Sequence, residues 1–141
     1  MSDSGKSDSG KLVGIVLVSH SGPVAESVAA LATGLAGGGA APVAAAGGTA
    51  DGGLGTSADL IAAAAHRVDR GAGVAVLADL GSAVLTVKAL IAEGDELPEG
   101  TRLVDAPFVE GAVAAAVTAS AGADIAAVEA AAREAYGYRK E

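Results

Sequence analysis

Two short apolar runs constrain the fold of this chain more than any other feature. Residues 12–18 and residues 73–78 carry no charged side chain. Continuous apolar runs of this length, bounded by turn residues, are typical of strands that are buried on both faces. Such strands occur almost only in parallel sheets with helices packed on both sides. The two runs therefore predict an α/β fold built on a parallel sheet.

The segments around these runs alternate between strand-like and helix-like patterns. Residues 42–46 and 101–104 are predicted to be two further, shorter strands, and the other stretches carry apolar residues at helical spacing. The predicted helices cover residues 23–36, 56–70, 82–91, 109–120 and 124–135. This order predicts a small doubly wound parallel sheet of about four strands with helices on both faces.

Polar residues mark where several of these helices are expected to begin. Thr56 is the predicted cap of the second helix, with Asp59 in the position of a capping-box acid. Ser82 is the predicted cap of the third helix and Asp124 of the last. Three apolar residues of the second helix are expected to face inward: Leu60, Ile61 and Val68.

The length of 141 residues suits one domain with its own core. Hydrophobic residues make up 51% of the chain and aromatic residues only 2%, so the core must be built from Val, Leu, Ile and Ala. We expect the domain over residues 12–136, a disordered tail over 1–11 that repeats Ser-Asp-Ser-Gly-Lys, and a polar end over 137–141. The uncharged stretch 27–50 is broken by glycines and Pro42, so we expect no membrane span and a cytoplasmic protein.

Charge and residue counts exclude several classes of function. The formal net charge of −8 argues against nucleic acid or an anionic membrane as the main partner, because both attract a basic face. There are no cysteines, which excludes disulfides and thiolate ligands. With two histidines and no cluster at ligand spacing, the sequence predicts neither a metal nor another cofactor.

Polar loops that contain glycine or proline follow all four predicted strands, and these loops meet at one edge of a parallel sheet. The first contains Ser19, His20 and Ser21, and the third contains Asp79, Gly81 and Ser82. A histidine can accept and release a phosphoryl group, and an aspartate can fix its tautomer. We therefore predict His20 as the nucleophile and Asp79 as the residue that orients it. Phosphate-holding groups are expected at Ser19, Ser21, Thr56, Gly81 and Ser82.

Simpler interpretations of these residues stay open at this point. Asp79 and Ser82 can serve only to cap a helix, and Thr56 and Ser57 are better explained as caps than as ligands. His66 is expected to be a solvated surface residue. Asp51 suits a turn, and Glu110 suits the first turn of a helix. A Walker-type nucleotide loop and a Gly-x-Ser-x-Gly hydrolase elbow are both absent from the sequence.

Four ordered motifs resemble one known family. They lie at 14–21, 52–57, 79–83 and 106–112, and they are similar to the phosphotransfer subunit M of bacterial dihydroxyacetone kinase, of the kind that depends on the phosphotransferase system. The resemblance runs from about residue 11 to about residue 135. More distantly, the chain is similar to the mannose-type IIA domains of the sugar phosphotransferase system.

The resemblance implies a phosphotransferase component with a phosphorylated histidine at His20 and its aspartate partner at Asp79. The carrier protein HPr would donate the phosphoryl group to His20, which would pass it to ADP on the kinase's L subunit, while the K subunit holds dihydroxyacetone. Relatives of this kind are homodimers. Lys88 stands where the family is expected to have an acidic residue, which bears on partner docking.

Two other functions remain compatible with the same residues. One is a non-catalytic regulatory module of the same fold, in which phosphorylation of His20 switches partner binding. The other is a binding module for a small anion. The proposed chemistry requires His20 and Asp79 to be neighbours, so we expect the first and third strands to be adjacent in the sheet.

Overall fold

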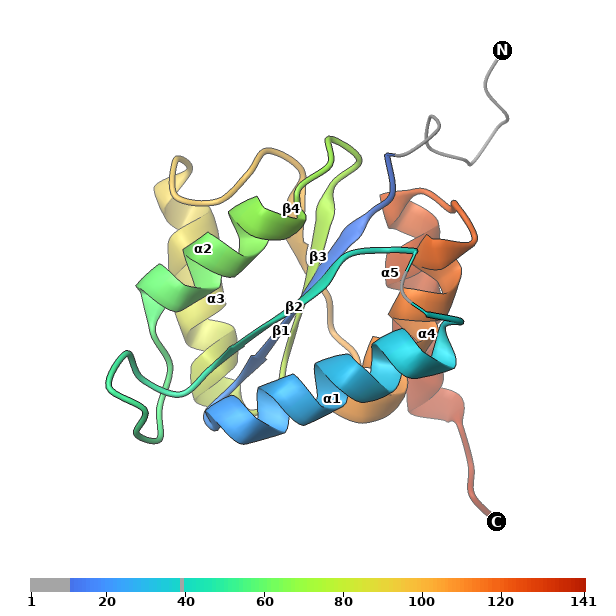
Figure 1. The fold of residues 1–141 in the computed structure, drawn as a ribbon, viewed down its shortest axis with the longest axis horizontal. Helices are drawn as coiled ribbons and strands as arrows, with labels where there is room; N and C mark the ends of the chain where they lie inside the picture. The colour runs from blue at the N-terminus through green and yellow to red at the C-terminus, as the bar shows by residue number, and fades with distance from the viewer. Residues whose placement is uncertain (1–10, 39) are drawn as a thin grey trace.

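The computed structural model describes residues 11–38 and 40–141, so most of the predicted tail, and Gly39 in the glycine run after the first helix, lie outside the described residues. Four strands and five α-helices follow the predicted order (Figure 1). The strands are β1 (Gly14–Ser19), β2 (Val43–Gly47), β3 (Val74–Ala78) and β4 (Thr101–Leu103). The helices are α1 (Gly22–Leu35), α2 (Ala58–Val68), α3 (Gly81–Glu93), α4 (Phe108–Ser120) and α5 (Ile125–Glu134), followed by a 3₁₀ turn over Ala135–Gly137.

The four strands form one sheet in the order β2-β1-β3-β4, and all three pairings are parallel. In the central pair, Ile15 lies opposite Ala75 and Val18 lies opposite Ala78. The expected adjacency of the first and third strands is confirmed. The carboxyl ends of β1 and β3 therefore lie side by side at one edge of the sheet.

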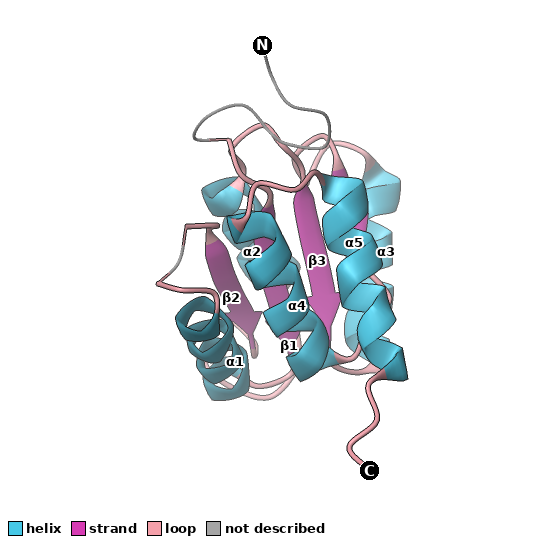
Figure 2. Ribbon diagram, turned by 90° about the vertical axis from the view of Figure 1, so that its right-hand side faces the viewer, coloured by secondary structure: helices cyan, strands magenta, loops and turns pink. Residues whose placement is uncertain are grey.

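Alternate residues of the central strands face two separate apolar layers. Ile15, Leu17 and Leu77 pack with α1, α4 and α5. Val16, Val18 and Val76 face the other way and pack with α2 and α3. Figure 2 shows α4 and α5 in front of the strands, whereas Figure 1 shows α2 and α3 on the opposite side of the sheet. Because both faces are covered, the predicted doubly wound α/β fold is confirmed.

Alanines form most of the helix surfaces that touch the sheet. In α1 the buried residues are Ala25, Val28 and Ala32, while Leu31 and Leu35 are exposed. The expectation that Leu60 faces inward is wrong, because α2 buries Ile61, Ala64, Ala65 and Val68 and leaves Leu60 exposed. Small side chains let each helix lie close to the strands, so the larger leucines turn outward.

The helix starts correct two of the predicted caps. Ser57, not Thr56, caps α2, and its hydroxyl accepts a hydrogen bond from the N–H of Leu60 at 3.2 Å. The cap position of α3 is Leu80, so Ser82 lies inside the first turn and is not the cap. The predicted cap of the last helix is confirmed, since the Asp124 carboxylate accepts from the N–H of Ala127 at 3.0 Å.

Two glycines at the end of β2 hold the β1–α1 loop in place. A Cβ on Gly47 would lie 2.4 Å from the carbonyl oxygen of Ser21, so no larger residue fits there. Gly48 has a φ of 74° and donates its N–H to the carbonyl of Ser19 at 3.1 Å. A positive φ of this kind favours glycine. The loop that carries His20 is therefore packed directly against the neighbouring strand end.

None of the described helices has the length and apolar character that are needed to cross a membrane.

Candidate active site

His20 follows β1 directly and lies beside Asp79, which follows β3. The ring Nδ1 of His20 is 3.0 Å from Oδ1 of Asp79. The side chains of His20 and Asp79 are 25% and 17% exposed, so the pair is partly shielded but open to an approaching molecule. The structure thus brings together the two residues that the sequence predicts as nucleophile and orienting residue.

Four donors converge on the Asp79 carboxylate. Its Oδ2 accepts from the Ser19 hydroxyl at 2.8 Å and from the backbone N–H of His20 at 3.1 Å. Its Oδ1 accepts from the N–H of Leu80 at 2.7 Å and faces the His20 ring. Partial burial alone would raise the pKa of Asp79, but hydrogen bonds from Ser19, His20 and Leu80 outweigh it and lower that pKa. The carboxylate is therefore ionised and fixed in orientation.

The other ring nitrogen of His20, Nε2, meets the hydroxyl of Ser82 in the first turn of α3. An ionised Asp79 favours a proton on Nδ1, so in the neutral ring the lone pair is on Nε2. The Ser82 hydroxyl then donates to that lone pair. Ser82 lies in the first turn of α3, so the positive end of this helix is close to Nε2. No side chain in the described part of the chain caps the N–H groups at this helix start.

The two serines that flank His20 both make local hydrogen bonds. Ser19 is 1% exposed, is the last residue of β1, and accepts the N–H of Ser21 at 3.1 Å while it donates to Asp79. The Ser19 hydroxyl is thus engaged with Asp79 and Ser21, and its contact with a phosphoryl group stays a prediction. Ser21 caps α1 by accepting the N–H of Val24 at 3.3 Å. Among the described residues, neither hydroxyl is hydrogen-bonded to Nε2.

Thr56 joins the site through Thr86, a residue that the sequence did not single out. Its Oγ1 lies 3.1 Å from Oγ1 of Thr86, and the Thr86 hydroxyl donates to the carbonyl of Ser82 at 3.1 Å. Thr86 stands one helical turn after Ser82 on α3, and this spacing is the one sequence feature that could have indicated that the two residues are neighbours. Gly81, by contrast, has open space where a Cβ would lie.

The β2–α2 loop is also tied to the site. The N–H of Gly55 donates to the carbonyl of His20 at 2.9 Å. Asp51 stabilises the turn of this loop by accepting from the Thr49 hydroxyl and from the N–H of Gly53, and the Thr49 bond is the main cause of its lowered pKa. The interpretation of Asp51 as a turn residue is therefore confirmed.

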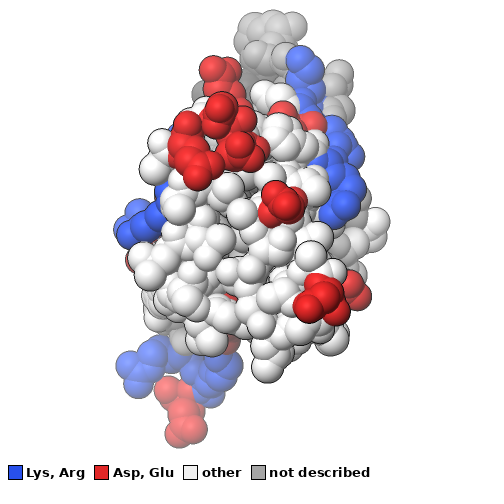
Figure 3. All heavy atoms as spheres, turned by 90° about the vertical axis from the view of Figure 1, so that its left-hand side faces the viewer, with Lys and Arg blue, Asp and Glu red and all other residues white. Residues whose placement is uncertain are grey.

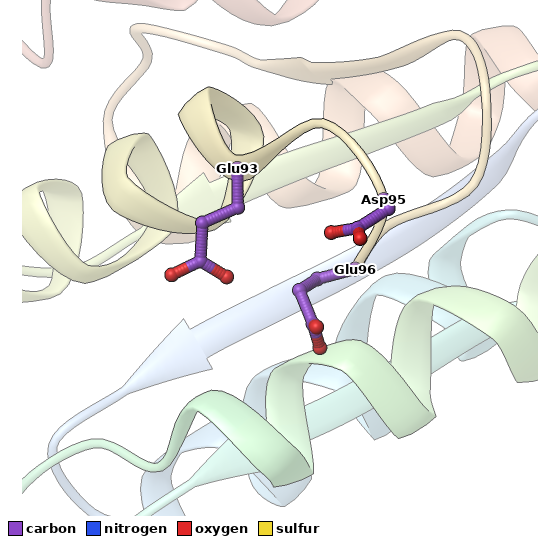
Figure 4. Close-up of side chains that lie close together, drawn as sticks. All are labelled: Glu93, Asp95 and Glu96. Carbon is purple, nitrogen blue, oxygen red and sulfur yellow. The ribbon is translucent and has the colours of Figure 1, made fainter.

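Other titratable residues lie apart from this site. Glu93, Asp95 and Glu96 place carboxylate oxygens within 4.8 Å of one another at the far end of α3 (Figure 4). The sequence analysis did not identify this exposed cluster, and nothing further in the described residues links it to a cation. His66 is exposed as expected, and its Nε2 lies 3.0 Å from the carbonyl oxygen of Glu96.

This geometry suits nucleophilic attack by histidine. Nδ1 is held by a fixed carboxylate, Nε2 carries an available lone pair, and a hydroxyl and an uncapped helix start lie where negative charge would develop. Helix starts and hydroxyl groups together favour a phosphoryl-sized anion. The side chains present are therefore compatible with transient phosphorylation of Nε2.

Sequence comparisons identify the family of this chain. The family model described as PTS system fructose IIA component matches residues 14–129. The phosphoryl donor subunit DhaM of PEP-dependent dihydroxyacetone kinase 2 from Listeria innocua is 37% identical over 107 residues, which are 75% of this chain and 85% of the relative. DhaM of the Escherichia coli kinase is 38% identical over 117 residues, which are 81% of this chain and 25% of that longer protein.

Structural comparisons agree with the fold. The crystal structure of the unknown function protein EF1359 has a TM-score of 0.80 and 31% identity, with 92% of this chain and 98% of that chain covered. A sigma-54 interaction domain protein from Enterococcus faecalis has a TM-score of 0.68 at 18% identity, with 91% and 93% covered. The second likeness concerns the fold alone.

Proposed function

The chain belongs to the PTS system fructose IIA component family and is related to DhaM, and from this premise we propose that it is the phosphohistidine relay subunit of a dihydroxyacetone kinase. It accepts a phosphoryl group from phospho-HPr on His20 and passes it to ADP held by the L subunit, in the cytoplasm. The contact of the His20 ring with both Asp79 and Ser82 carries this proposal.

In the first step, the lone pair of His20 Nε2 attacks the phosphorus of phospho-HPr. A new N–P bond forms on Nε2, the N–P bond of the donor breaks, and its electron pair returns to the donor's histidine. The Nδ1 proton stays on the ring, and Asp79 stabilises the positive charge that the ring gains. The Ser82 hydroxyl turns from the lone pair to an oxygen of the phosphoryl group.

The second step reverses the role of the ring. An oxygen of the terminal phosphate of ADP attacks the phosphorus, the bond to Nε2 breaks, and the lone pair returns to Nε2. The products are ATP on the L subunit and the original state of His20. Because Nδ1 keeps Asp79 as its partner and the Ser82 hydroxyl only turns between Nε2 and the phosphoryl group, Asp79 and Ser82 need no large movement between the steps.

The test is intact-mass measurement after incubation with phosphoenolpyruvate, enzyme I and HPr. We expect one acid-labile phosphoryl group on the wild type and on His66→Ala, and none on His20→Ala. The L and K subunits are then added with dihydroxyacetone, and formation of dihydroxyacetone phosphate is followed. Phosphorylation of His20 without turnover by the kinase subunits would instead indicate a regulatory module, and no phosphorylation at all would leave only an anion-binding module.

A homodimer is the assembly we propose for this subunit. A groove of about 610 Å³ runs along the outer surface of α1 and α4. Its lining is largely aliphatic, with Val109, Val113 and Val117 at every fourth residue of α4 and Leu31 and Leu35 on α1. Glu110 at its border is paired with Lys140 at 2.5 Å. A largely aliphatic groove of this kind, with Glu110 and Glu134 in its lining, suits a second copy of the chain.

Light scattering at micromolar concentration tests this assembly. The wild type is expected to have the mass of a dimer, and Val117→Lys the mass of a monomer, because the lysine places a charge in the groove. Leu60→Lys is the control, since Leu60 is an exposed apolar residue on α2, across the sheet. A monomeric wild type would contradict the proposal.

A further inference from the structure

Two threonine hydroxyls join the β2–α2 loop to α3 beside the active site. Oγ1 of Thr56, in the loop, lies 3.1 Å from Oγ1 of Thr86, in α3. The Thr86 hydroxyl donates its one proton to the carbonyl of Ser82 at 3.1 Å, so in its contact with Thr56 it can only accept. Thr56 therefore donates to Thr86, and Thr86 donates to Ser82. We call Thr56 and Thr86 the threonine bridge.

The bond from Thr86 to Ser82 is by itself an ordinary feature of a helix, since threonine hydroxyls often donate to the carbonyl four residues earlier. The contact with Thr56 is different because it comes from another element of the fold, 30 residues away in the chain. Both threonines are partly buried, which reduces the access of water to the contact between them. The bridge therefore fixes the first turn of α3 relative to the β2–α2 loop.

The same loop also holds the backbone of His20. The N–H of Gly55, the residue before Thr56, donates to the carbonyl of His20 at 2.9 Å. From Thr56 the contacts lead through Thr86 to Ser82, whose hydroxyl meets Nε2 of the same histidine. The contacts thus form a closed circuit that begins and ends at His20. Figure 1 shows its parts at the lower left, where the β2–α2 loop approaches the starts of α1 and α3.

The first turn of α3 has little other support at its start. Its cap position is Leu80, whose side chain cannot accept a hydrogen bond. Gly81 follows, with open space where a Cβ would lie, and glycine leaves the backbone more freedom than any other residue. In the proposed reaction, however, Ser82 has to stay within hydrogen-bond reach of Nε2 before and after the transfer.

The threonine bridge is made of uncharged groups. The ion pair of the site joins His20 to Asp79, whereas the bridge consists of hydroxyl and carbonyl groups. Figure 3 shows wide uncharged areas on the side of the molecule where the β2–α2 loop and α3 lie. Each hydrogen bond of the bridge thus has the modest strength of a neutral pair. Loss of the bridge should shift Ser82 without unfolding the domain.

We propose that Thr56 and Thr86 are positioning residues for phosphoryl transfer, which hold the Ser82 hydroxyl at Nε2 of His20. This inference rests on the proposed function. In this role both threonines act through Ser82, so their effect on the reaction depends on the presence of the Ser82 hydroxyl.

The experiment is a double-mutant cycle on the full-length protein. The donor is phosphoramidate, a small molecule that phosphorylates histidine directly, so binding of a protein partner does not enter the measurement. Thr86→Val removes the hydroxyl and keeps the branched shape, and we expect the rate of His20 phosphorylation to fall about fivefold, the effect of one neutral hydrogen bond. Thr56→Val should act in the same way. In a Ser82→Ala background neither change should slow the reaction further, because the group that the threonines position is gone.

A second measurement follows the His20 ring itself. A Ser82 hydroxyl that donates to Nε2 favours the neutral ring with its proton on Nδ1, and nitrogen-15 NMR of labelled histidine reports this state. We expect the Nε2 signal of Thr86→Val to move from its wild-type position toward that of Ser82→Ala. Thr86→Ser keeps the hydroxyl and should restore both the signal and the rate, the latter to within about twofold of the wild type.

The matched control is Thr33→Val, at a partly buried threonine of α1, which should leave rate and spectrum unchanged. Equal slowing by Thr86→Val with and without the Ser82 hydroxyl would indicate a general structural role and overturn the inference. Wild-type rates for both Thr56→Val and Thr86→Val would also overturn it, and in either case the phosphorelay stays intact. Failure of the wild type to react with phosphoramidate and with phospho-HPr would instead overturn the proposed function.

Discussion

Replacing Ser19 by alanine removes one of the four donors that hold the Asp79 carboxylate. The lost contact is the 2.8 Å hydrogen bond to Oδ2, which then keeps only the backbone N–H of His20. The N–H of Ser21 also loses its acceptor, the Ser19 oxygen. Ser19 is 1% exposed, so water replaces the hydroxyl poorly. A hydrogen bond to a charged group contributes about 1.5–3 kcal/mol, and we expect Ser19→Ala to lower the free energy of unfolding by about 2 kcal/mol.

The effect must depend on pH in a defined direction. The folded-state pKa of Asp79 is lowered, so the stability that its carboxylate contributes is present at neutral pH and is lost as pH falls through that pKa. Ser19→Ala takes away part of this contribution. The difference between wild type and variant should therefore be largest at neutral pH and shrink in acid, where both proteins carry a protonated Asp79.

Urea unfolding at neutral and at acid pH measures the difference directly. The phosphorylation of His20 by phosphoramidate is followed in parallel, and we expect it to slow in Ser19→Ala because a less constrained carboxylate holds the ring less well. Ser19→Thr keeps the hydroxyl and should restore both properties. Ser27→Ala, at an exposed position of α1, is the control. If Ser19→Ala matched Ser27→Ala in stability and rate, the positioning role of Ser19 would be refuted.

Three other substitutions test separate parts of the structure. Ser82→Ala should keep the fold, by circular dichroism, yet slow phosphorylation by phosphoramidate about ten- to a hundredfold, the loss of one hydrogen bond to a charged group; an unchanged rate would contradict its role. Gly47→Ala should lower the unfolding free energy by about 1–3 kcal/mol, because its Cβ would lie 2.4 Å from the Ser21 carbonyl. Gly34→Ala, where α1 has open space, should instead stabilise by about 0.5–1 kcal/mol in the same urea titration. Ser57→Ala removes the cap of α2 and should lower the free energy of unfolding by about 1 kcal/mol, measured by thermal unfolding. An unchanged stability would indicate that Thr56, not Ser57, is the cap.

The sequence was sufficient to predict the parallel sheet, and the chemistry proposed for its loops led to the expected pairing of His20 with Asp79. Runs of Val, Leu and Ile can be buried on both faces only in a helix-covered parallel sheet, and parallel strands place the loops that follow them at one edge. The adjacency of β1 and β3 then brings the two residues within hydrogen-bond distance. The strand order itself could not be read from the sequence, and the adjacency was expected only because the proposed chemistry requires His20 and Asp79 to be neighbours.

Single-residue details were less predictable, for physical reasons. Ser19 looks like a loop residue, but β1 extends through it and buries its hydroxyl. Thr56 and Ser57 are both residue types that cap helices well. Which of them is the cap depends on whether the helix begins one residue earlier or later, and α2 begins at Ala58. Thr86 has no signal in the sequence beyond its spacing from Ser82. Leu60 was expected inside with Ile61 and Val68, whereas the face of α2 that packs on the sheet carries Ala64 and Ala65.

The alanine-covered sheet also affects how the stability of this protein varies with temperature. Alanine has no rotamer freedom to lose on folding, but it removes little apolar area from water. Unfolding of a core with few large side chains therefore exposes less apolar surface for each residue than usual. The heat-capacity change of unfolding should then lie below the usual value of about 12–15 cal/mol/K per residue. With a smaller heat-capacity change, the curve of unfolding free energy against temperature is flatter, and stability declines only gently on cooling.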